Sequence, residues 1–579
     1  MIGGPCPVCD GKRLRQESLS VRFEGLDLAE MSRLPMARFS KIFAPYAEAK
    51  ADKLKTLRKT HPEKALVVER IASDLCRRLS VLLDLGLGYL TLERSTPTLS
   101  PGELQRLRLA TQVVSNLFGV VYVMDEPSAG LHPADTEALL RALDGLKAVG
   151  NSLFVVEHEM DVVRRADWIV DVGPAAGEHG GQILYSGPIE GLAEVAASET
   201  RRHLFDEGGG VTSRMREPAA WLRLEGVSRN NLKQVDCEIP LGVMTTVTGI
   251  SGSGKSSLIS QALVELVAAA LGAPAGKDDA DGEAAFEDAP AVATEGRILG
   301  GLDGIRRLIE VDQKPIGRTP RSNLATYTGL FDHVRALFAA TPEARKRRYD
   351  AGRFSFNVAK GRCPRCEGEG FVMVELLFLP SVYAPCPACQ GARYNPKTLE
   401  ITYNGKTIAE VLALTVEQAW DFFGDAPNVC RSLKVLREVG LNYLRLGQPA
   451  TEFSGGEAQR IKLATELQRA QRGGALYVLD EPTTGLHPTD VERLLGQLNA
   501  LVDAGNSVIL VDHDMKVAAA SDWVIDIGPG AGEEGGRIVA SGPPAKVAGS
   551  RASRTGPYLD RALRGPMGSL DQSEGISPP

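Results

Sequence analysis

The sequence predicts an α/β protein in which one arrangement of strands and helices occurs twice. A glycine-rich loop at 249–257 lies between an apolar, β-branched run and a helical pattern, which is the order strand, loop, helix. Short motifs from the first 170 residues recur near the C-terminus, which indicates an internal duplication. Two C-x-x-C pairs at 363–389 indicate an inserted metal-binding module.

The composition is that of a globular protein. The chain has 579 residues, 43% of them hydrophobic and 24% charged, which is enough for about three to five domains. The net charge of −7 gives no overall attraction to nucleic acid, so such binding would need local basic patches. No apolar run approaches the roughly 18 residues of a membrane helix, and the N-terminus does not resemble a signal peptide. We therefore expect a cytoplasmic protein that has no membrane partner.

The loop at 249–257 has the residue types of a phosphate-binding loop, G-x-x-x-x-G-K-S. It follows the apolar run at 243–248 and precedes a helical pattern from Leu258 to Leu271. In such a loop the glycines let backbone N–H groups point at phosphate oxygens, the lysine reaches the β- and γ-phosphates, and the next serine ligates Mg²⁺. The pattern predicts ATP and Mg²⁺ as ligands, bound by Gly249, Ser251, Gly252, Ser253, Gly254, Lys255, Ser256 and Ser257. A flexible Gly/Ser turn is the alternative, and the flanking strand and helix argue against it.

The duplication extends over most of the chain. The matched segments are 6–13 with 386–393, 99–106 with 453–460, 121–127 with 476–482, 130–133 with 485–488, 156–158 with 511–513 and 167–168 with 522–523. From Asp125 onward the offset is 355, because 480 minus 125 is 355. With that offset a partner for the phosphate loop would lie before Met1, so we expect the first copy to lack its front end in this chain.

Two acids end an apolar strand in each copy. In the second copy the strand reads Tyr477-Val478-Leu479-Asp480-Glu481. We predict that Asp480 holds Mg²⁺ together with Ser256, and that Glu481 orients or deprotonates the attacking water. An acid pair at the end of a strand is weak evidence by itself. The upstream phosphate loop and the nearby Ser-Gly-Gly-Glu segment favour the functional interpretation.

The segment 453–460, Phe-Ser-Gly-Gly-Glu-Ala-Gln-Arg, begins a helix whose N-terminus can bind an anion. An ordinary N-cap at Ser454 is the plain alternative. With the strand-end acids, this segment resembles the signature of ATP-binding-cassette (ABC) ATPases. The resemblance implies tandem ABC-type P-loop NTPase lobes, with His513 as the switch histidine and Gln313 as the Q-loop residue. The predicted catalytic residues are therefore Glu481, His513 and Gln313.

ABC cassettes pair head to tail, so the resemblance implies that loop 249–257 faces segment 99–106 of the first copy. Ser100, Gly102 and Glu103 are then expected to close over ATP. Pro101 stands where the second copy has glycine, and proline removes one backbone N–H. We expect this composite site to be complete.

The opposite composite site would place Asp125, Glu126 and His158 against segment 453–460. It has no phosphate loop in this chain. We therefore expect one competent ATP site per chain, unless a second polypeptide supplies the other loop.

The spacing Cys363-x2-Cys366-x19-Cys386-x2-Cys389 is typical of a structural Cys₄ zinc site. Two redox-active pairs are the alternative. In a reducing cytosol we expect metal ligands and not disulfides. The pair Cys6 and Cys9 matches only the second half of this motif.

Together with the zinc motif, the segments 316–323 and 354–357 make the chain similar to the UvrA family, which senses DNA damage in bacterial nucleotide excision repair. The resemblance covers nearly the whole chain. It implies an ATPase subunit of an excinuclease, not the nuclease itself, that forms a homodimer, binds damaged double-stranded DNA and loads UvrB. In the family the UvrB-binding insertion lies in the region with no counterpart here, which puts UvrB recruitment in doubt.

Basic residues cluster where the resemblance predicts DNA contact. They are Arg318, Arg321, Arg353, Lys360, Arg362 and Arg365. Phosphate contacts give affinity without sequence preference, which suits a lesion sensor that reads deformability. A solvated face beside a zinc knuckle is the alternative for any one of them.

The predicted domains follow the motifs. They are a remnant of the first signature and zinc domain at 1–95, the first ABC lobe without its phosphate loop at 96–200, the phosphate-loop and Q-loop lobe at 219–339, the zinc-containing insertion at 340–445, the second signature lobe at 446–550 and a partly disordered tail at 551–579. We also expect a linker at 201–218 and a disordered insertion at 272–296.

Three other functions are compatible with parts of this pattern. A UvrA-like drug self-resistance ATPase would act on DNA-bound compounds. An inactive fragment of a longer UvrA would neither hydrolyse ATP nor recognise DNA damage. A transporter ATPase is disfavoured by the zinc insertion and by the absence of a membrane segment.

Overall fold

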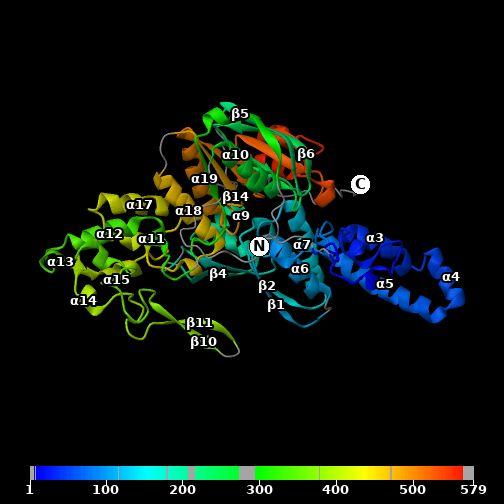
Figure 1. Cartoon of the computed structure of the whole chain (residues 1–579), viewed down its shortest axis with the longest axis horizontal. Coiled ribbons are helices and arrows are strands. Elements are labelled where there is room, and N and C mark those ends of the chain that lie inside the picture. Colours follow the sequence, from blue (N-terminus) through cyan, green and yellow to red (C-terminus); the bar gives the residue numbers. More distant parts are fainter. Residues whose placement is uncertain are drawn as a thin grey trace. The chain divides into compact units, whose positions relative to one another are not determined.

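The computed structural model describes residues 6, 8–114, 117–175, 177, 180–205, 215–272, 294–317, 319–376, 379–469 and 473–564. Within it the chain forms two compact units, and each unit combines pieces from both copies of the repeat. The first unit contains Met1–Arg165, Glu207–Leu308 and Ile509–Pro579, and the second contains Ala166–Asp206 and Ile309–Val508. Figure 1 labels many of the elements.

Among its described residues, the first unit contains short and long helices and eight complete strands. The helices are α1 (Gln16–Leu19), α2 (Leu28–Ser32), α3 (Met36–Ala47), α4 (Asp52–Thr60), α5 (Pro62–Asp84), α6 (Pro101–Val114), α7 (Pro133–Ala148), α8 (Met160–Val163), α10 (Val264–Ala270), α20 (Met515–Ala520), α21 (Pro544–Ala548) and α22 (Gly556–Arg564). The strands are β1 (Val121–Asp125), β2 (Ser152–Val156), β5 (Ala220–Arg229), β6 (Leu232–Leu241), β7 (Met244–Thr248), β8 (Glu295–Gly300), β16 (Trp523–Gly528) and β17 (Arg537–Gly542).

The second unit is richer in helices. These are α9 (Glu199–Phe205), α11 (Leu324–Tyr327), α12 (Leu330–Ala339), α13 (Pro342–Lys346), α14 (Pro396–Leu399), α15 (Ile408–Ala413), α16 (Val416–Phe422), α17 (Pro427–Glu438), α18 (Gly455–Arg469) and α19 (Pro488–Asp503). Its strands are β3 (Ile169–Gly173), β4 (Gln182–Gly187), β10 (Phe371–Leu376), β11 (Leu379–Pro385), β12 (Thr402–Tyr403), β13 (Lys406–Thr407) and β14 (Ala475–Asp480). The chain passes between the units within β9 (Arg307–Val311) and β15 (Ser507–Val511).

The strand that leads into the phosphate loop is a central one. β7 pairs in parallel with β16, with Thr248 beside Asp526, and β16 pairs antiparallel with β17. All five residues of β7 are buried, as expected for a strand covered on both faces. A separate antiparallel sheet has the order β6-β5-β8. The parallel pairing places the end of β7, and therefore the start of the loop, at one edge of the sheet.

The sequence repeat is also a structural repeat. The β3–β4 pair shifts register between Asp171 and Val172, and the β16–β17 pair shifts between Asp526 and Ile527, which are the same positions at an offset of 355. The copies differ in burial. β14 is buried along Ala475–Leu479 and β15 throughout, whereas β1 and β2 expose alternate residues, such as Val123 at 76% and Phe154 at 62%.

Helical parts flank the strands in each unit. In the first unit α3 and α4 both contact α5 (Figure 1), and the apolar faces of α6 and α7 enclose Tyr122 of β1. In the second unit α12, α16, α17 and α18 share one large core that includes Phe338, Phe354 and Phe356. Within the described part of the chain, every helix falls short of the length and apolar character that crossing a membrane requires.

Two expectations about irregular segments need correction. Residues 201–205 of the expected linker are the end of α9, because Arg201 and Arg202 are held by the Ala193 carbonyl and by Glu492. Glu295 and Gly296 of the expected insertion belong to β8, because pairing with β5 outweighs their polar composition. Residues 206–214, 273–293 and 565–579 lie outside the described residues.

Candidate functional site

The phosphate loop leaves β7 with a backbone that needs glycine. Gly249, Gly252 and Gly254 have φ values of 134°, 75° and 111°, which L side chains rarely adopt. A Cβ on Gly249 would also lie 2.1 Å from the Ile527 carbonyl oxygen. These three positions of the loop therefore require glycine.

Lys255 is held inside this loop. Its side chain is buried, and its Nζ donates hydrogen bonds to the carbonyls of Gly249 at 2.9 Å and Ile250 at 3.0 Å. The hydroxyls of Ser251 and Ser253 are buried and have no hydrogen-bond partner among the described residues. A polyphosphate is the kind of ligand that such a loop accepts.

The segment after the loop is helical, as its pattern predicts. It begins as a π-helix over Ser257–Leu263 and continues as α10. Leu258, Ile259 and Leu263 pack their apolar side chains into the interior. π-helical turns are frequent at functional sites, and no residue pattern in the sequence distinguishes them from α-helix.

Elements of the first copy contact the loop of the second copy within the first unit. The Ser251 N–H donates to Asp135 Oδ2 of α7 at 3.0 Å. A Cβ on Gly252 would lie 2.5 Å from the ring of Tyr89, and the Tyr89 hydroxyl donates to Glu103 Oε1 at 2.5 Å. The loop thus connects through one tyrosine to the first signature segment.

The first signature segment begins α6 with a reciprocal cap. The Ser100 N–H donates to Glu103 Oε2 at 2.8 Å, and the Glu103 N–H donates to Ser100 Oγ at 3.2 Å. Arg94 adds an ion pair to Glu103 at 3.1 Å. Burial raises the pKa of Tyr89, and the nearby Glu103 carboxylate acts in the same direction, so the phenol stays a donor.

His513 lies in the same unit, just after β15. Asp512 Oδ1 accepts from the His513 N–H at 2.7 Å and from the Asp514 N–H at 2.9 Å, which fixes the turn. Burial lowers the pKa of His513 well below its usual value, and the positive charge of Lys255 lowers it further. The imidazole is therefore neutral at pH 7.

The predicted catalytic residues of the second unit lie together. Gln313 Nε2 donates to the Glu481 carbonyl at 3.1 Å, and Gln459 Nε2 donates to the Asp480 carbonyl at 2.7 Å. Glu481 has a φ of 48°, a left-handed conformation that costs about 1–3 kcal/mol for such a residue. Glu126, its counterpart in the first copy, has a φ of 44°. Strain of this kind is concentrated at functional sites.

The second signature segment repeats the geometry of the first. The Ser454 N–H donates to Glu457 Oε2 at 2.8 Å, the Glu457 N–H donates to Ser454 Oγ at 3.2 Å, and the Tyr443 hydroxyl donates to Glu457 Oε1 at 2.6 Å. The structure thus brings Lys255 and His513 together in the first unit, and Gln313, Asp480 and Glu481 together in the second.

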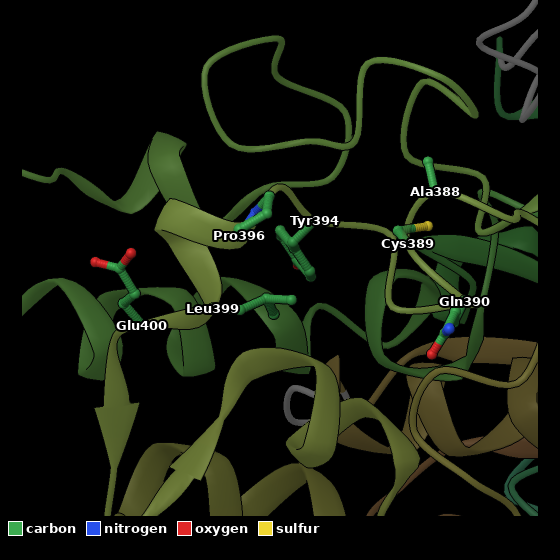
Figure 2. A pocket seen from close by; sticks show the side chains of 7 residues that line it. All are labelled: Ala388, Cys389, Gln390, Tyr394, Pro396, Leu399 and Glu400. Atoms are coloured by element: carbon green, nitrogen blue, oxygen red, sulfur yellow. The ribbon is translucent and has the colours of Figure 1, made fainter.

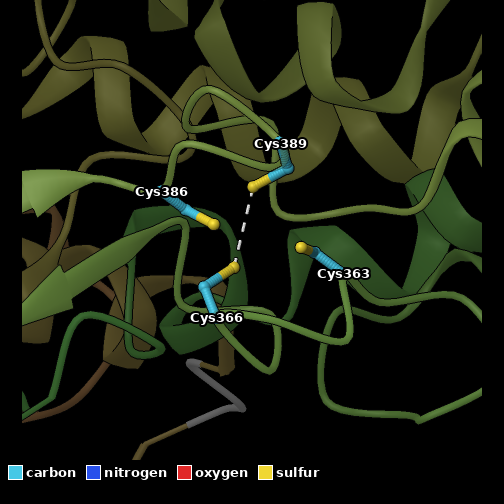
Figure 3. A group of neighbouring side chains, drawn as sticks. All are labelled: Cys363, Cys366, Cys386 and Cys389. Atoms are coloured by element: carbon cyan, nitrogen blue, oxygen red, sulfur yellow. Dashed lines mark hydrogen bonds between the residues drawn. The ribbon is translucent and has the colours of Figure 1, made fainter.

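The four cysteines of the predicted zinc site converge (Figure 3). Cys363, Cys366 and Cys386 are buried and Cys389 is half-buried, and the four Sγ atoms all lie within 4.8 Å of one another. The Cys366 and Cys389 Sγ atoms are 3.6 Å apart. Four thiolates at about 2.3 Å from a tetrahedral zinc ion lie about 3.8 Å from one another. The donor set therefore suits zinc in both chemistry and spacing.

A cavity of about 330 Å³ opens beside this cluster (Figure 2). Its lining combines the second knuckle with the start of α14 and comprises Ala388, Cys389, Gln390, Tyr394, Pro396, Leu399 and Glu400. The Tyr394 hydroxyl donates to the Phe354 carbonyl at 2.9 Å, so the cavity wall is fixed to the helical core.

The pair Cys6 and Cys9 has the backbone of a zinc knuckle. Asp10 and Gly11 have φ values of 49° and 75°, and their counterparts Gln390 and Gly391 have 49° and 87°. The Asp10 N–H donates to the Cys6 carbonyl at 2.8 Å, as the Gln390 N–H does to the Cys386 carbonyl at 2.7 Å.

The basic residues predicted to contact DNA differ in their surroundings. Arg321 and Arg362 form ion pairs with Glu367, at 3.6 Å and 3.2 Å. Arg353 stacks on Tyr349. Of the remaining predicted residues, Lys360 and Arg365 are exposed, and Arg318 lies outside the described residues.

Comparison with known proteins decides the family. No family model matches the chain. It is 66% identical over 404 residues to the UvrABC system protein A of Paucimonas lemoignei, covering 69% of this chain and 58% of that protein. It is 49% identical over 562 residues to the protein of the same name from Thermus thermophilus, covering 96% of this chain and 56% of that protein. The structure of UvrA2 from Deinococcus radiodurans matches with a TM-score of 0.89 and 66% identity, over 96% of this chain and 66% of that one. The chain belongs to the UvrA family.

This UvrA-family chain spans about half the length of the curated relatives it matches. The predicted α/β fold class, with its signature and zinc-knuckle insertions, is confirmed by the match to a UvrA structure and by the cysteine cluster. The names of the relatives do not favour the drug-resistance or transporter alternatives.

Several residues that contact the site lie outside the motifs to which the sequence assigns a role. Tyr89, His132 and Asp135 all lie near the phosphate loop or His513. A signal was present, because each recurs in the second copy, as Tyr443, His487 and Asp490. A comparison of the two copies outside the known ABC motifs would have selected them.

The pH dependence of stability in this UvrA-family chain should reflect His132. Burial lowers the pKa of His132 from about 6.5 to about 4. Its folded pKa is depressed, so the unfolded chain binds the extra proton between these values and stability falls as pH drops from 6.5 toward 4. Between pH 6.5 and 5 the free energy of unfolding should fall by up to about 2 kcal/mol more in the native protein than in His132→Asn. Urea denaturation at both pH values measures this, and equal pH slopes would contradict it.

Proposed function

We propose that this chain is an ATPase that couples ATP hydrolysis to the recognition of damaged double-stranded DNA in nucleotide excision repair. The observation that carries the proposal is the contact of the phosphate loop with the first signature segment, through Gly252, Tyr89 and Glu103. Head-to-tail closure of one copy over the nucleotide of the other requires such a contact. Family membership supports the same activity.

Each of the predicted site residues has a separate role in ATP hydrolysis. Lys255 and Ser256 bind the phosphates and Mg²⁺, and Asp480 holds the metal ion. Glu481 orients the attacking water and accepts its proton. Bound Mg²⁺ supplies charge neutralisation for the transferred phosphoryl group. Ser100, Gly102 and Glu103 close the site from the first copy, while Gln313 and His513 respond to the γ-phosphate.

The zinc proposal is supported by the four converging cysteines, Cys363, Cys366, Cys386 and Cys389. A structural zinc ion would tie both knuckles to the hairpin β10–β11, which Figure 3 shows entering and leaving the cluster beside Cys386. We assign the ion no catalytic role, because four thiolates leave no open coordination position.

The proposed partners are damaged double-stranded DNA and a second copy of the chain. UvrB is the protein partner to test, because the relatives are named as components of the UvrABC system. We propose the cytoplasm as the location of this activity, where ATP and DNA are both available in a bacterium.

The double variant Lys360→Ala/Arg365→Ala tests the DNA interface. Both residues are exposed beside the zinc cluster, so losing two phosphate contacts should weaken binding to duplexes with and without a lesion by a similar factor. The slope of log K against log salt concentration should become shallower by about 2. Fluorescence anisotropy with a fluorescein-adducted duplex measures both.

The matched control is Lys233→Ala/Lys516→Ala, which removes two exposed lysines elsewhere on the chain. It should leave affinity and salt slope unchanged. Equal losses in both double variants would mean that binding follows total charge and not the predicted surface. A native protein that neither hydrolyses ATP nor binds DNA would overturn the proposed function.

A further inference from the structure

His132 contacts residues of both copies next to the phosphate loop. It is wholly buried at the start of α7, and its Nδ1 accepts a hydrogen bond from the Ala134 N–H at 3.2 Å. Its Nε2 lies 3.1 Å from Thr555 Oγ1, and the Thr555 hydroxyl donates to Asp526 Oδ1 at 2.8 Å. His132 belongs to the first copy of the repeat, whereas Thr555 and Asp526 belong to the second copy.

These contacts fix the protonation state of the ring. A backbone N–H can only donate, so Nδ1 of His132 must carry a lone pair. The Thr555 proton is used toward Asp526, so Thr555 Oγ1 accepts from Nε2, which carries the hydrogen. His132 is consequently a neutral imidazole in a single tautomer and orientation.

The groups around the ring come from four parts of the first unit. The ring of His513 lies edge-on at a centroid distance of 6.1 Å, and the ring of Tyr558 on α22 lies at 5.6 Å. The charges that act on His132 are those of Asp135, Lys255 and Arg554. Two neutral imidazoles, one from each copy, therefore lie next to the lysine of the phosphate loop.

Capping of α7 does not account for the whole arrangement. The Nδ1 contact alone satisfies the cap, and His487 caps α19 in the same way through the Thr489 N–H at 3.3 Å. The chain from Nε2 through Thr555 to Asp526 is not needed for the cap. At the equivalent positions of the other copy Thr200 Oγ1 donates to Asp171 Oδ1 at 2.8 Å, so the threonine–aspartate bond occurs in both copies. The bond from His132 Nε2 to Thr555 fixes the ring plane that His513 packs against.

We propose that His132 is a positioning residue of the nucleotide site at 249–257, which acts by holding the switch histidine His513 in place from the opposite copy. The inference rests on the proposed ATPase function. His132 itself transfers no proton. Thr555 and Asp526 hold His132, and His132 in turn limits the orientations open to His513.

The decisive variant is His132→Asn. Asparagine is one of the most favourable N-cap residues, so α7 should still begin normally. The Nε2 donor to Thr555 is lost in this variant. A role in capping alone predicts native kinetics. Our proposal predicts a kcat for ATP hydrolysis that is about 10- to 100-fold lower, with KM for ATP changed by less than about twofold.

Thr555→Val and Thr555→Ser test the other end of the chain of contacts. Valine has a similar volume but no hydroxyl, so Thr555→Val should lower kcat as His132→Asn does. Serine keeps the hydroxyl, so Thr555→Ser should keep the native kcat. The double variant His132→Asn/Thr555→Val should lose no more than either single variant, because both break one pathway. His487→Asn is the matched control and should keep kcat within about twofold.

The outcomes separate the two proposals. A native protein that does not hydrolyse ATP overturns the function and this inference with it. A native protein that hydrolyses ATP, combined with native kcat in His132→Asn and in Thr555→Val, overturns the inference alone. If Thr555→Val fails to fold, the kcat of His132→Asn compared with that of His487→Asn still tests the inference. Equal losses of kcat in those two variants would also count against the inference.

Discussion

Glu481→Gln is expected to bind ATP with near-native affinity and to hydrolyse it about 10²- to 10⁴-fold more slowly. Glutamine has nearly the same shape as glutamate but cannot accept the proton of the attacking water. The backbone contact from Gln313 to the Glu481 carbonyl does not involve the changed atoms, so the local turn should persist. Equilibrium nucleotide binding and steady-state phosphate release measure the two quantities separately.

Glu126→Gln is the control for this prediction. It makes the same change at the same strained turn of the first copy, where Glu126 Oε1 lies 3.3 Å from His158 Nε2. The sequence contains one G-x-x-x-x-G-K-S loop, in the copy that carries Glu481, so Glu126→Gln should keep the rate within about twofold. Native turnover in Glu481→Gln would contradict the role assigned to this glutamate, and loss of ATP binding would indicate a structural defect instead.

Cys386→Ser is expected to release zinc and to unfold the surrounding knuckles. Apparent zinc-binding free energies of about 10–16 kcal/mol contribute directly to folding in such modules. Cys386 is fully buried against the other three cysteines, so a serine there leaves three thiols that repel one another once ionised. Metal analysis should show one zinc equivalent fewer per chain than in the native protein. Hydrogen exchange over 361–395 should rise strongly.

Cys430→Ser controls for the loss of any cysteine. Its Sγ donates to the Phe423 carbonyl at 3.0 Å, a contact that a serine hydroxyl can replace, and it lies apart from the four-cysteine cluster. This variant should keep its zinc and its exchange pattern. Unchanged zinc content in Cys386→Ser would refute the proposed ligand set.

The sequence was sufficient for the features that depend on local pattern. The apolar run before the phosphate loop, at 243–248, contains β7, and the strand predicted at Tyr477–Glu481 overlaps β14. The convergence of Cys363, Cys366, Cys386 and Cys389 also follows from spacing, because two short knuckles can enclose one ion. In each case the residues that form the feature are close together in the chain or follow a known period.

Features that depend on distant partners were missed. Thr555 and Asp526, the residues that hold the His132 ring, lie 423 and 394 positions away from it in the chain (555 minus 132 and 526 minus 132). Nothing in the local sequence around His132 specifies such partners. Likewise, the polar residues Glu295 and Gly296 become part of an edge strand only because β5 offers a pairing partner.

The contacts of Tyr89 and Tyr443 have an evolutionary consequence. A Cβ on Gly532 would lie 2.8 Å from Tyr89, and a Cβ on Gly177 would lie 2.6 Å from Tyr443, so each copy's tyrosine requires a glycine encoded in the other copy. After the ancestral duplication, neither half of the gene could drift at these positions independently. Recombination that replaced one half with a diverged homologue would succeed only where both members of each tyrosine–glycine pair were inherited in compatible form.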